Sequence, residues 1–346
     1  MLGSGGFSRG SMNTELKLFR LNRGLPNEFF EMVNNILASE LCSQNLKNGI
    51  ETTIFLDTNI LSNIRKFTFK EQSLDSRVHN IIERVIEIFS KLSNVYISPG
   101  FGIYESCDLL KEKNIMAFNI FLEQYLPKYG EAYNAQNNQS LQEDETFYLL
   151  NTCASIFAVH YVRKKYSHLL AIERFKKFLG LLQEHLNFID ALVCEIAKYA
   201  FLDSDECSEI HKKIVKNFIK SCDTKKQSLN AAYDLLLIRV IAMSHDQTLP
   251  SFVGRMDNWG LTTDQGIIEF ANLISFGKKS GPLISVDLIN TENHEDYFSQ
   301  CSTYYDSIVW QRLNNPIIQK NLRDKVITLN KAKSFISKLE SEALPA

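Results

Sequence analysis

The sequence predicts an α/β protein in which helices cover both faces of a central parallel sheet, a three-layer α/β/α core. Short runs rich in β-branched and aromatic residues are typical of buried strands. They alternate with longer segments whose apolar residues recur every three or four positions, which is typical of helices. This alternation favours a parallel sheet, because a parallel connection needs a crossover that is usually helical. The expected strands are 52–56, 94–98, 259–264 and 283–286.

Composition places the chain among ordinary globular proteins. It has 346 residues, of which 45% are hydrophobic and 23% are charged, and its formal net charge is −2. That charge excludes a global basic field, although a local one can still bind nucleic acid. The seven cysteines are scattered and form no CxxC pair, which favours reduced thiols and a cytoplasmic location. No run of about 18 apolar residues is present, so we expect no membrane span.

The N-terminal part is expected to consist of a tail and a helix before the first strand. Residues 1–11 are rich in glycine and serine, which indicates an expression tag or a disordered tail. Pro26 precedes apolar residues at helical spacing, which predicts a helix over 27–46 within an N-terminal helical segment, 12–50. The first part of the core then covers 51–105, with a helix at 76–92 between its two strands.

The rest of the chain is expected to be mostly helical. The segment 106–227 is longer than a connection inside a compact α/β unit needs to be, so we interpret it as a helical insertion or cap. The core resumes over 228–290, where Ser228 is expected to cap a helix that extends to about 243. Gly277 is expected to end a further helix, 265–276, and C-terminal helices at 294–314 and 316–341 occupy the last part, 291–346.

Four carboxylates accompany the expected core elements. Asp57 and Asp264 end two strands, Glu105 lies in the helix that Pro99 starts, and Asp234 lies on an apolar helix face. Each has a purely structural explanation: a turn for Asp57, a helix cap for Asp264, the positive end of a helix dipole for Glu105, and a hydrogen-bonded buried carboxyl for Asp234. Together they predict a site for Mg²⁺ or Mn²⁺, because hard cations prefer carboxylate oxygens.

The order of these segments resembles the PIN domain nucleases, a family that includes the toxins of bacterial toxin–antitoxin pairs. The resemblance covers little more than a third of the chain, within 51–105 and 228–290. It implies a metal-dependent ribonuclease in which Asp57, Glu105, Asp234 and Asp264 hold Mg²⁺ or Mn²⁺ and an attacking water, with Asn59 and Thr262 in support. The matching segments are Ile54-Phe55-Leu56-Asp57-Thr58-Asn59, Val95-Tyr96-Ile97-Ser98-Pro99 with Glu105, Tyr233-Asp234-Leu235, and Leu261-Thr262-Thr263-Asp264.

The chain departs from the family pattern between its second and third acids. Far more residues than usual lie between Glu105 and Asp234, and the helical insertion accounts for them. Asp190, in Phe188-Ile189-Asp190-Ala191-Leu192, matches the family's third acid about as well and is an alternative. We favour Asp234 because it lies closer in sequence to Asp264, which suits the compact arrangement of the family.

The resemblance also sets expectations about partners. RNA is the expected substrate ahead of DNA, and a protein inhibitor or activator is expected because an uncontrolled nuclease would harm its host. A toxin or defence role follows from the family alone. Basic runs such as Arg163-Lys164-Lys165 and Lys176-Lys177 are mostly ordinary solvated helix faces, although they could hold a nucleic-acid backbone. Alternatives are an inactive PIN-like binding or assembly module and a DNA nuclease, and the sequence does not indicate the oligomeric state.

Overall fold

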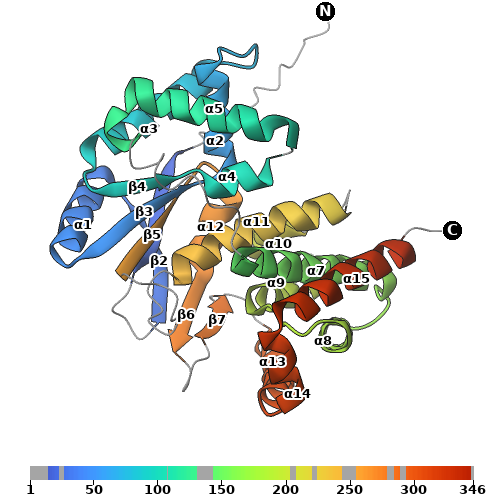
Figure 1. The fold of residues 1–346 in the computed structure, drawn as a ribbon. Helices are drawn as coiled ribbons and strands as arrows, with labels where there is room; N and C mark the ends of the chain where they lie inside the picture. Colours follow the sequence, from blue (N-terminus) through green and yellow to red (C-terminus); the bar gives the residue numbers. More distant parts are fainter. Residues whose placement is uncertain are drawn as a thin grey trace, which may run out of the picture.

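The computed structural model has an α/β fold built on one seven-stranded sheet (Figure 1). The expected tail, 1–11, lies outside the residues that the structure describes. Among the described helices, none is both long enough and apolar enough to cross a membrane. The described residues are 15–22, 27–106, 108–130, 143–202, 208–219, 224–243, 255–278, 284–288 and 294–343.

The sheet is mixed, with the strand order β4-β3-β5-β1-β2-β6-β7. Strand β3 pairs in parallel with both β4 and β5, whereas every other neighbouring pair is antiparallel. The expected parallel sheet is therefore correct for three strands and wrong for the other four. Only four residues separate β1 from β2, and so short a connection can join only antiparallel neighbours. The strands are β1 Lys17–Asn22, β2 Asn27–Val33, β3 Ile50–Leu56, β4 Val95–Ser98, β5 Arg255–Thr262, β6 Ile274–Lys278 and β7 Ile284–Leu288.

The N-terminal segment corrects the expectation of one helix over 27–46. Two strands come first, and helix α1, Asn35–Lys47, begins only after Asn34, whose side chain accepts hydrogen bonds from the amides of its first turn at 3.1 and 3.0 Å. The apolar residues of β2 fit helical spacing, but short apolar runs do not distinguish a helix from a strand. Tertiary contacts decide here, because the Phe30 ring packs edge-on against both Phe19 and Phe276.

Three further boundaries differ from those expected. The single helix predicted over 316–341 is two helices, Pro316–Arg323 and Lys325–Ala343, which meet at Asp324. The helix predicted over 265–276 ends earlier, as α12 Gln265–Leu273, and its last residues form the strand β6. Gly277 therefore lies inside a strand, where it pairs with Asn27 on one side and Ser285 on the other. Helix α11, Thr224–Met243, begins four residues before Ser228, so Ser228 is a buried helical residue and not a cap.

One face of the sheet packs against the helices of the first third of the chain. Ile54 and Leu56 of β3 join a buried cluster with residues of these helices. Helix α5 belongs to the cluster through Phe118 and Phe121, although it lies in the sequence expected to be an insertion. The helices are α1, α2 Thr58–Thr68, α3 Ser76–Lys91, α4 Gly100–Glu105 and α5 Asp108–Tyr125, and α3 confirms the helix predicted over 76–92.

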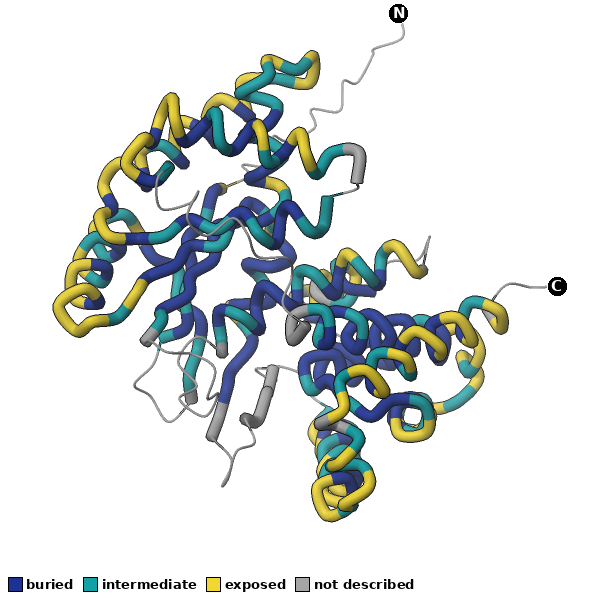
Figure 2. Tube along the Cα trace, viewed as in Figure 1, coloured by how far each residue is buried: buried dark blue, intermediate teal, exposed yellow. Residues whose placement is uncertain are grey.

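A second buried cluster joins the remaining helices, except α14, which packs on α13 and α15. The cluster reaches the sheet through Phe19, Leu21 and Phe30. Helix α7 packs against both α11 and α15, and buried residues line these contacts (Figure 2). Because side chains alternate along a strand, Leu18 faces the first cluster whereas its neighbour Phe19 faces the second. The helices are α7 Glu143–Lys165, α8 Ala171–His185, α9 Ala191–Phe201, α10 Glu209–Phe218, α11, α12, α13 Glu295–Leu313, α14 Pro316–Arg323 and α15 Lys325–Ala343.

Candidate carboxylate site

Three of the four predicted acids follow the three parallel strands. Asp57 comes directly after β3, and Asp264 follows β5 by two residues. Glu105 is the last residue of α4, the short helix that follows β4. Because parallel strands end at the same edge of a sheet, the three acids are brought to one edge, the part of an open α/β sheet where ligands usually bind.

Asp57 is buried and does not serve as a helix cap. It occupies the N-cap position of α2, yet its side chain makes no capping hydrogen bond. Its Oδ2 instead accepts a 2.7 Å hydrogen bond from the Thr262 hydroxyl and a 3.3 Å bond from the Asn59 amide. Residues from two separate strand ends therefore hold this carboxylate, and both predicted supporting residues contact it.

Thr262 also connects Asp57 to Asp264. Its hydroxyl oxygen accepts the backbone N–H of Asp264 at 2.8 Å while it donates to Asp57. The Asp264 carboxylate caps α12, because its Oδ1 accepts the N–H groups of Gly266 at 2.7 Å and Ile267 at 3.3 Å. The structural explanation of Asp264 as a cap is thus correct, and the same residue also stands beside the buried Asp57.

Glu105 completes the group through Thr58. The Thr58 hydroxyl, one residue after Asp57, donates a hydrogen bond to Oε2 of Glu105. Next to Glu105, the backbone oxygen of Tyr104 accepts a 3.1 Å bond from the Tyr233 hydroxyl of α11. The Glu105 carboxylate is thereby bonded to the first residue of α2, while the backbone next to it is bonded to the middle of α11.

The electrostatics show that the three carboxylates share one field. Burial raises the pKa of Asp57 to about 6; the Asp264 charge adds to the rise, whereas hydrogen bonds from Thr262 and Asn59 oppose it. Burial likewise raises the pKa of Glu105 to about 7, opposed by the Thr58 hydrogen bond and assisted by the charges of Asp57 and Asp264. These raised pKa values mean that ionising the carboxyl groups costs free energy in the folded protein. A bound cation would lower that cost by neutralising their charge.

The structure relates Asp234, the third acid of the family pattern, to the site through its neighbour Tyr233. Asp234 lies half-buried on α11, and its preceding neighbour Tyr233 contacts α4. Glu105 is one of the charges that raise the pKa of Tyr233, after burial, so this turn of α11 lies within electrostatic reach of the site. The role of Asp234 as a ligand stays a prediction.

Asp190 has a structural role. It is fully buried, and its Oδ1 accepts hydrogen bonds from Arg239 at 2.6 Å and from the Leu192 amide at 3.1 Å. Its Oδ2 accepts the Thr152 hydroxyl. Both oxygens are therefore engaged in joining α7, α9 and α11, which removes the reason to treat Asp190 as the third acid.

Two residues near the site were not anticipated. Thr58 lies inside the Asp-Thr-Asn motif, so the sequence predicts its position near the site but not its hydrogen bond to Glu105. Asn217, on α10, carries no sequence signal. Its amide packs so closely on Gly266 that a Cβ there would lie 2.5 Å from the amide nitrogen and 3.0 Å from Oδ1 of Asp264. Helix α10 therefore brings a polar side chain to the edge of the carboxylate site.

The donor set has the right chemistry for Mg²⁺ or Mn²⁺, since all its ligands are oxygens. The described hydrogen bonds to Glu105 and to the Asp264 side chain each fall on one oxygen, so the second oxygen of each carboxylate is available to a cation. Within the described part of the chain, no three His, Cys, Asp or Glu side chains are already close enough to hold an ion. Binding would therefore need these side chains to draw together.

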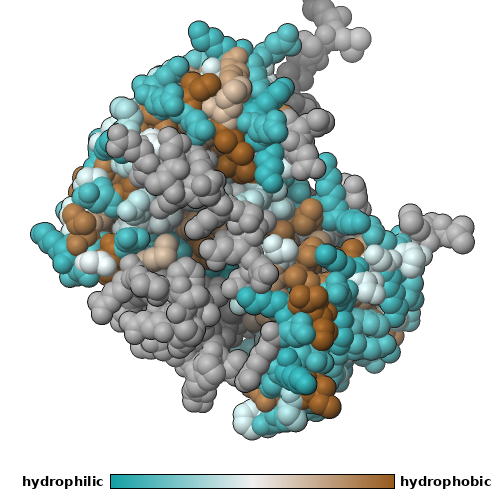
Figure 3. Space-filling view, in the orientation of Figure 1, coloured by the Kyte–Doolittle hydropathy of each residue, from teal (hydrophilic) through white to brown (hydrophobic). Residues whose placement is uncertain are grey.

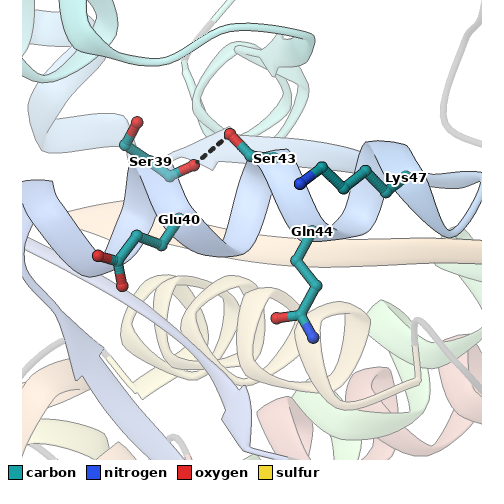
Figure 4. A pocket seen from close by; sticks show the side chains of 5 residues that line it. All are labelled: Ser39, Glu40, Ser43, Gln44 and Lys47. Carbon is teal, nitrogen blue, oxygen red and sulfur yellow. Dashed lines mark hydrogen bonds between the residues drawn. The ribbon is translucent and has the colours of Figure 1, made fainter.

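A separate surface feature carries no comparable chemistry. A shallow depression of about 340 Å³ lies along α1 (Figure 4). All its lining residues belong to one helix, and its only drawn hydrogen bond runs from the Ser43 hydroxyl to the backbone oxygen of Ser39 at 2.9 Å. It shares no residue with the carboxylate site. Its lining residues are Ser39, Glu40, Ser43, Gln44 and Lys47.

Comparisons with known proteins add no family to this description. No protein-family model, curated protein or solved structure matches the chain. The likeness to PIN domain nucleases therefore depends on the motifs and on the arrangement of the acids described above.

Proposed function

We propose that the protein is a PIN-like, metal-dependent nuclease that hydrolyses phosphodiester bonds in RNA. The observation that carries this proposal is the group of Asp57, Glu105 and Asp264, which follow three parallel strands, together with the raised pKa values of Asp57 and Glu105. Mutual repulsion among buried carboxylates destabilises a fold. Such groups are therefore typical of sites where a function needs them. Catalysis with a divalent cation is such a function.

Each residue has a defined task in this proposal. Asp57, Glu105 and Asp264 would hold Mg²⁺ or Mn²⁺, with Asp234 as the fourth acid. When bound, the cation supplies an activated water and neutralises the charge that develops on the leaving oxygen. Thr262 and Asn59 orient the Asp57 carboxylate, and Thr58 orients Glu105. Fixed orientation matters because ligands that are already positioned lose less freedom when the cation binds.

The wider expectations of the family are part of the same proposal. The core would be a three-layer PIN-like unit, with the helices of the second cluster guiding the substrate. Control by a protein inhibitor or activator, and a toxin or defence role in the cytoplasm, rest on the family resemblance alone.

Cleavage of labelled single-stranded RNA tests the proposal. Wild-type protein and Asp57→Asn are compared with Mg²⁺, with Mn²⁺ and with a chelator. Metal-dependent cleavage should be lost in Asp57→Asn, because the nearly isosteric amide keeps the fold but lacks the charge. Glu83→Gln is the matched control, since Glu83 is an exposed carboxylate on α3 and its loss should change nothing. Equal residual cleavage in all three proteins would indicate contamination and refute the assignment.

A second candidate is a PIN-like binding module without catalysis, and the structural role of Asp264 favours it. The Asp264 carboxylate caps α12 through the amides of Gly266 and Ile267, a role that needs no metal. Calorimetric titration with Mn²⁺ separates the two candidates: a nuclease site should bind the ion in wild type and lose it in Asp57→Asn. Matched DNA substrates, assayed alongside the RNA, decide which nucleic acid is cleaved.

A further inference from the structure

Two of the basic runs in the sequence meet on the second helical cluster. Arg163-Lys164-Lys165 ends α7, and Lys176-Lys177 lies in the second turn of α8, one short connection later. All five side chains are exposed. In the sequence these runs look like ordinary solvated faces, but the fold places them next to each other and next to three tyrosines.

The tyrosines lie between the lysines. The ammonium of Lys165 is 4.8 Å from the centre of the Tyr161 ring and 6.0 Å from that of Tyr166. The ammonium of Lys177, from α8, is 5.9 Å from the same Tyr166 ring. Two cations from different helices thus approach one half-buried aromatic ring.

The other lysine of the α8 pair, Lys176, extends this arrangement to a third helix. The ammonium of Lys176 lies 5.7 Å from the ring of Tyr304, on α13. Because neighbouring helical residues are about 100° apart, Lys177 reaches toward the end of α7 while Lys176 reaches toward α13. We call this surface the basic–aromatic face; it consists of Lys164, Lys165, Tyr166, Lys176, Lys177 and Tyr304.

Acidic residues neutralise only part of this charge. Glu342 of α15 pairs with Lys165 at 3.0 Å and accepts the Tyr161 hydroxyl, and Glu173 is exposed at the start of α8. In the part of the chain that the structure describes, Lys164, Lys176 and Lys177 make no ion pair. The visible surface over α15 carries both hydrophilic and hydrophobic side chains (Figure 3). The face therefore keeps a net positive charge beside two half-buried aromatic rings.

We propose that the basic–aromatic face binds single-stranded nucleic acid. Lysine ammonium groups neutralise backbone phosphates, and aromatic rings stack on bases that are not already paired. The alternation of the two residue types across three helices matches a ligand that alternates phosphates with flat bases. The face shares no residue with the carboxylate site, so the proposal does not depend on the nuclease.

Fluorescence anisotropy with a labelled single-stranded RNA of about 12 nucleotides, a typical site size, tests the proposal. The full chain is titrated in a chelator, which excludes metal-dependent cleavage from the measurement. Lys176→Glu/Lys177→Glu should weaken binding at least tenfold. Lys47→Glu/Lys113→Glu makes the same charge change at exposed lysines of α1 and α5 and should bind within twofold of wild type.

Two further measurements separate this face from a merely cationic surface. Lys176→Gln/Lys177→Gln should lower the slope of log affinity against log salt by about 1.4, since each single-strand phosphate contact contributes about 0.7. Tyr166→Leu should weaken binding several-fold, whereas Tyr166→Phe, which keeps the ring, should not. Equal weakening by the two charge-reversed variants would overturn the proposal. So would unchanged binding by Tyr166→Leu, or equal affinity for duplex RNA or inorganic polyphosphate.

Discussion

The Thr262 hydroxyl donates a 2.7 Å hydrogen bond to Oδ2 of Asp57, a carboxylate 205 positions earlier in the chain. The same oxygen accepts the N–H of Asp264. One buried hydroxyl therefore fixes the distance between two acids of the candidate site. Its contribution is both structural, because it satisfies buried polar groups, and electrostatic, because it favours the ionised form of Asp57.

Replacing Thr262 by valine should raise the pKa of Asp57 above its wild-type value of about 6. Valine keeps the shape of the side chain but neither donates to the carboxylate nor accepts the Asp264 amide. Unpaired buried groups should also lower the free energy of unfolding by about 1–3 kcal/mol. Carboxyl NMR titration and urea denaturation measure the two effects. Thr263→Val is the matched control, because Thr263 is buried and its side chain makes no hydrogen bond to the described residues.

The raised pKa values of Asp57 and Glu105 predict a pH-dependent stability. Their folded-state values, about 6 and about 7, exceed the ordinary values of 3.8 and 4.5. Between about pH 4 and pH 7 the unfolded chain releases these protons first, so the folded state holds more of them and loses stability as the pH rises. Below about pH 4 both states are protonated and the contribution is fully present.

The double variant Asp57→Asn/Glu105→Gln should remove this loss. Its free energy of unfolding should exceed that of wild type at pH 8 by roughly 2–5 kcal/mol, since each pKa unit corresponds to about 1.4 kcal/mol. The difference should shrink as the pH falls to 4.5. Urea denaturation at both pH values provides the measurement. A difference that does not change with pH would show that the two carboxyls titrate as ordinary exposed groups.

The sequence was sufficient to place acids at strand ends. The runs Ile54-Phe55-Leu56 and Trp259-Gly260-Leu261 are short, lack charged residues and are followed directly by polar residues, a pattern that marks the end of a strand whatever the tertiary contacts. The rule that parallel strands end at one edge then places the acids on a shared edge. The same local reasoning could not exclude Asp190, because its pairing with Arg239 depends on a helix 49 positions away.

Most of the antiparallel part of the sheet was not predictable from local pattern, although the strand expected over 283–286 is present as β7. Residues of β2 and β6 have apolar spacings that fit a helix as well as a strand, and their pairing partners decide the outcome. Phe30 illustrates this, since the rings that pack against it come from β1 and β6. Asn217 was missed for the same reason: its closeness to Asp264 depends entirely on how α10 packs against α12.

Removing Arg239 should destabilise the protein strongly without affecting metal binding. Arg239 pairs with the fully buried Asp190 at 2.6 Å, and its guanidinium lies 4.8 Å from the Tyr148 ring centre. Arg239→Leu leaves a buried carboxylate without its cation, which typically costs about 3–5 kcal/mol. Adding Asp190→Leu should recover much of that loss in urea denaturation. If calorimetry showed that Asp190→Asn, in a folded protein, abolished Mn²⁺ binding, Asp190 would instead belong to the metal site.

Gly260 should be the least replaceable glycine among those the structure describes. It pairs with Phe19 across β5 and β1, and a Cβ there would lie 2.5 Å from two ring carbons of Phe19 and 2.7 Å from Cδ1 of Ile241. Both neighbours are fully buried, so Gly260→Ala should lower the free energy of unfolding by about 1–3 kcal/mol through overpacking. Equilibrium urea denaturation measures the change.

Gly180 offers the control for this substitution. It lies within α8, and a Cβ at this position meets nothing within 4 Å. Gly180→Ala should therefore stabilise the protein by about 0.5–1 kcal/mol, because alanine loses less backbone freedom than glycine on entering a helix. Combining Gly260→Ala with Phe19→Leu tests the cause directly, since the smaller side chain makes room for the new methyl group. The two changes should then cost less together than the sum of their separate effects, and simple additivity would place the strain elsewhere than at the Phe19 ring.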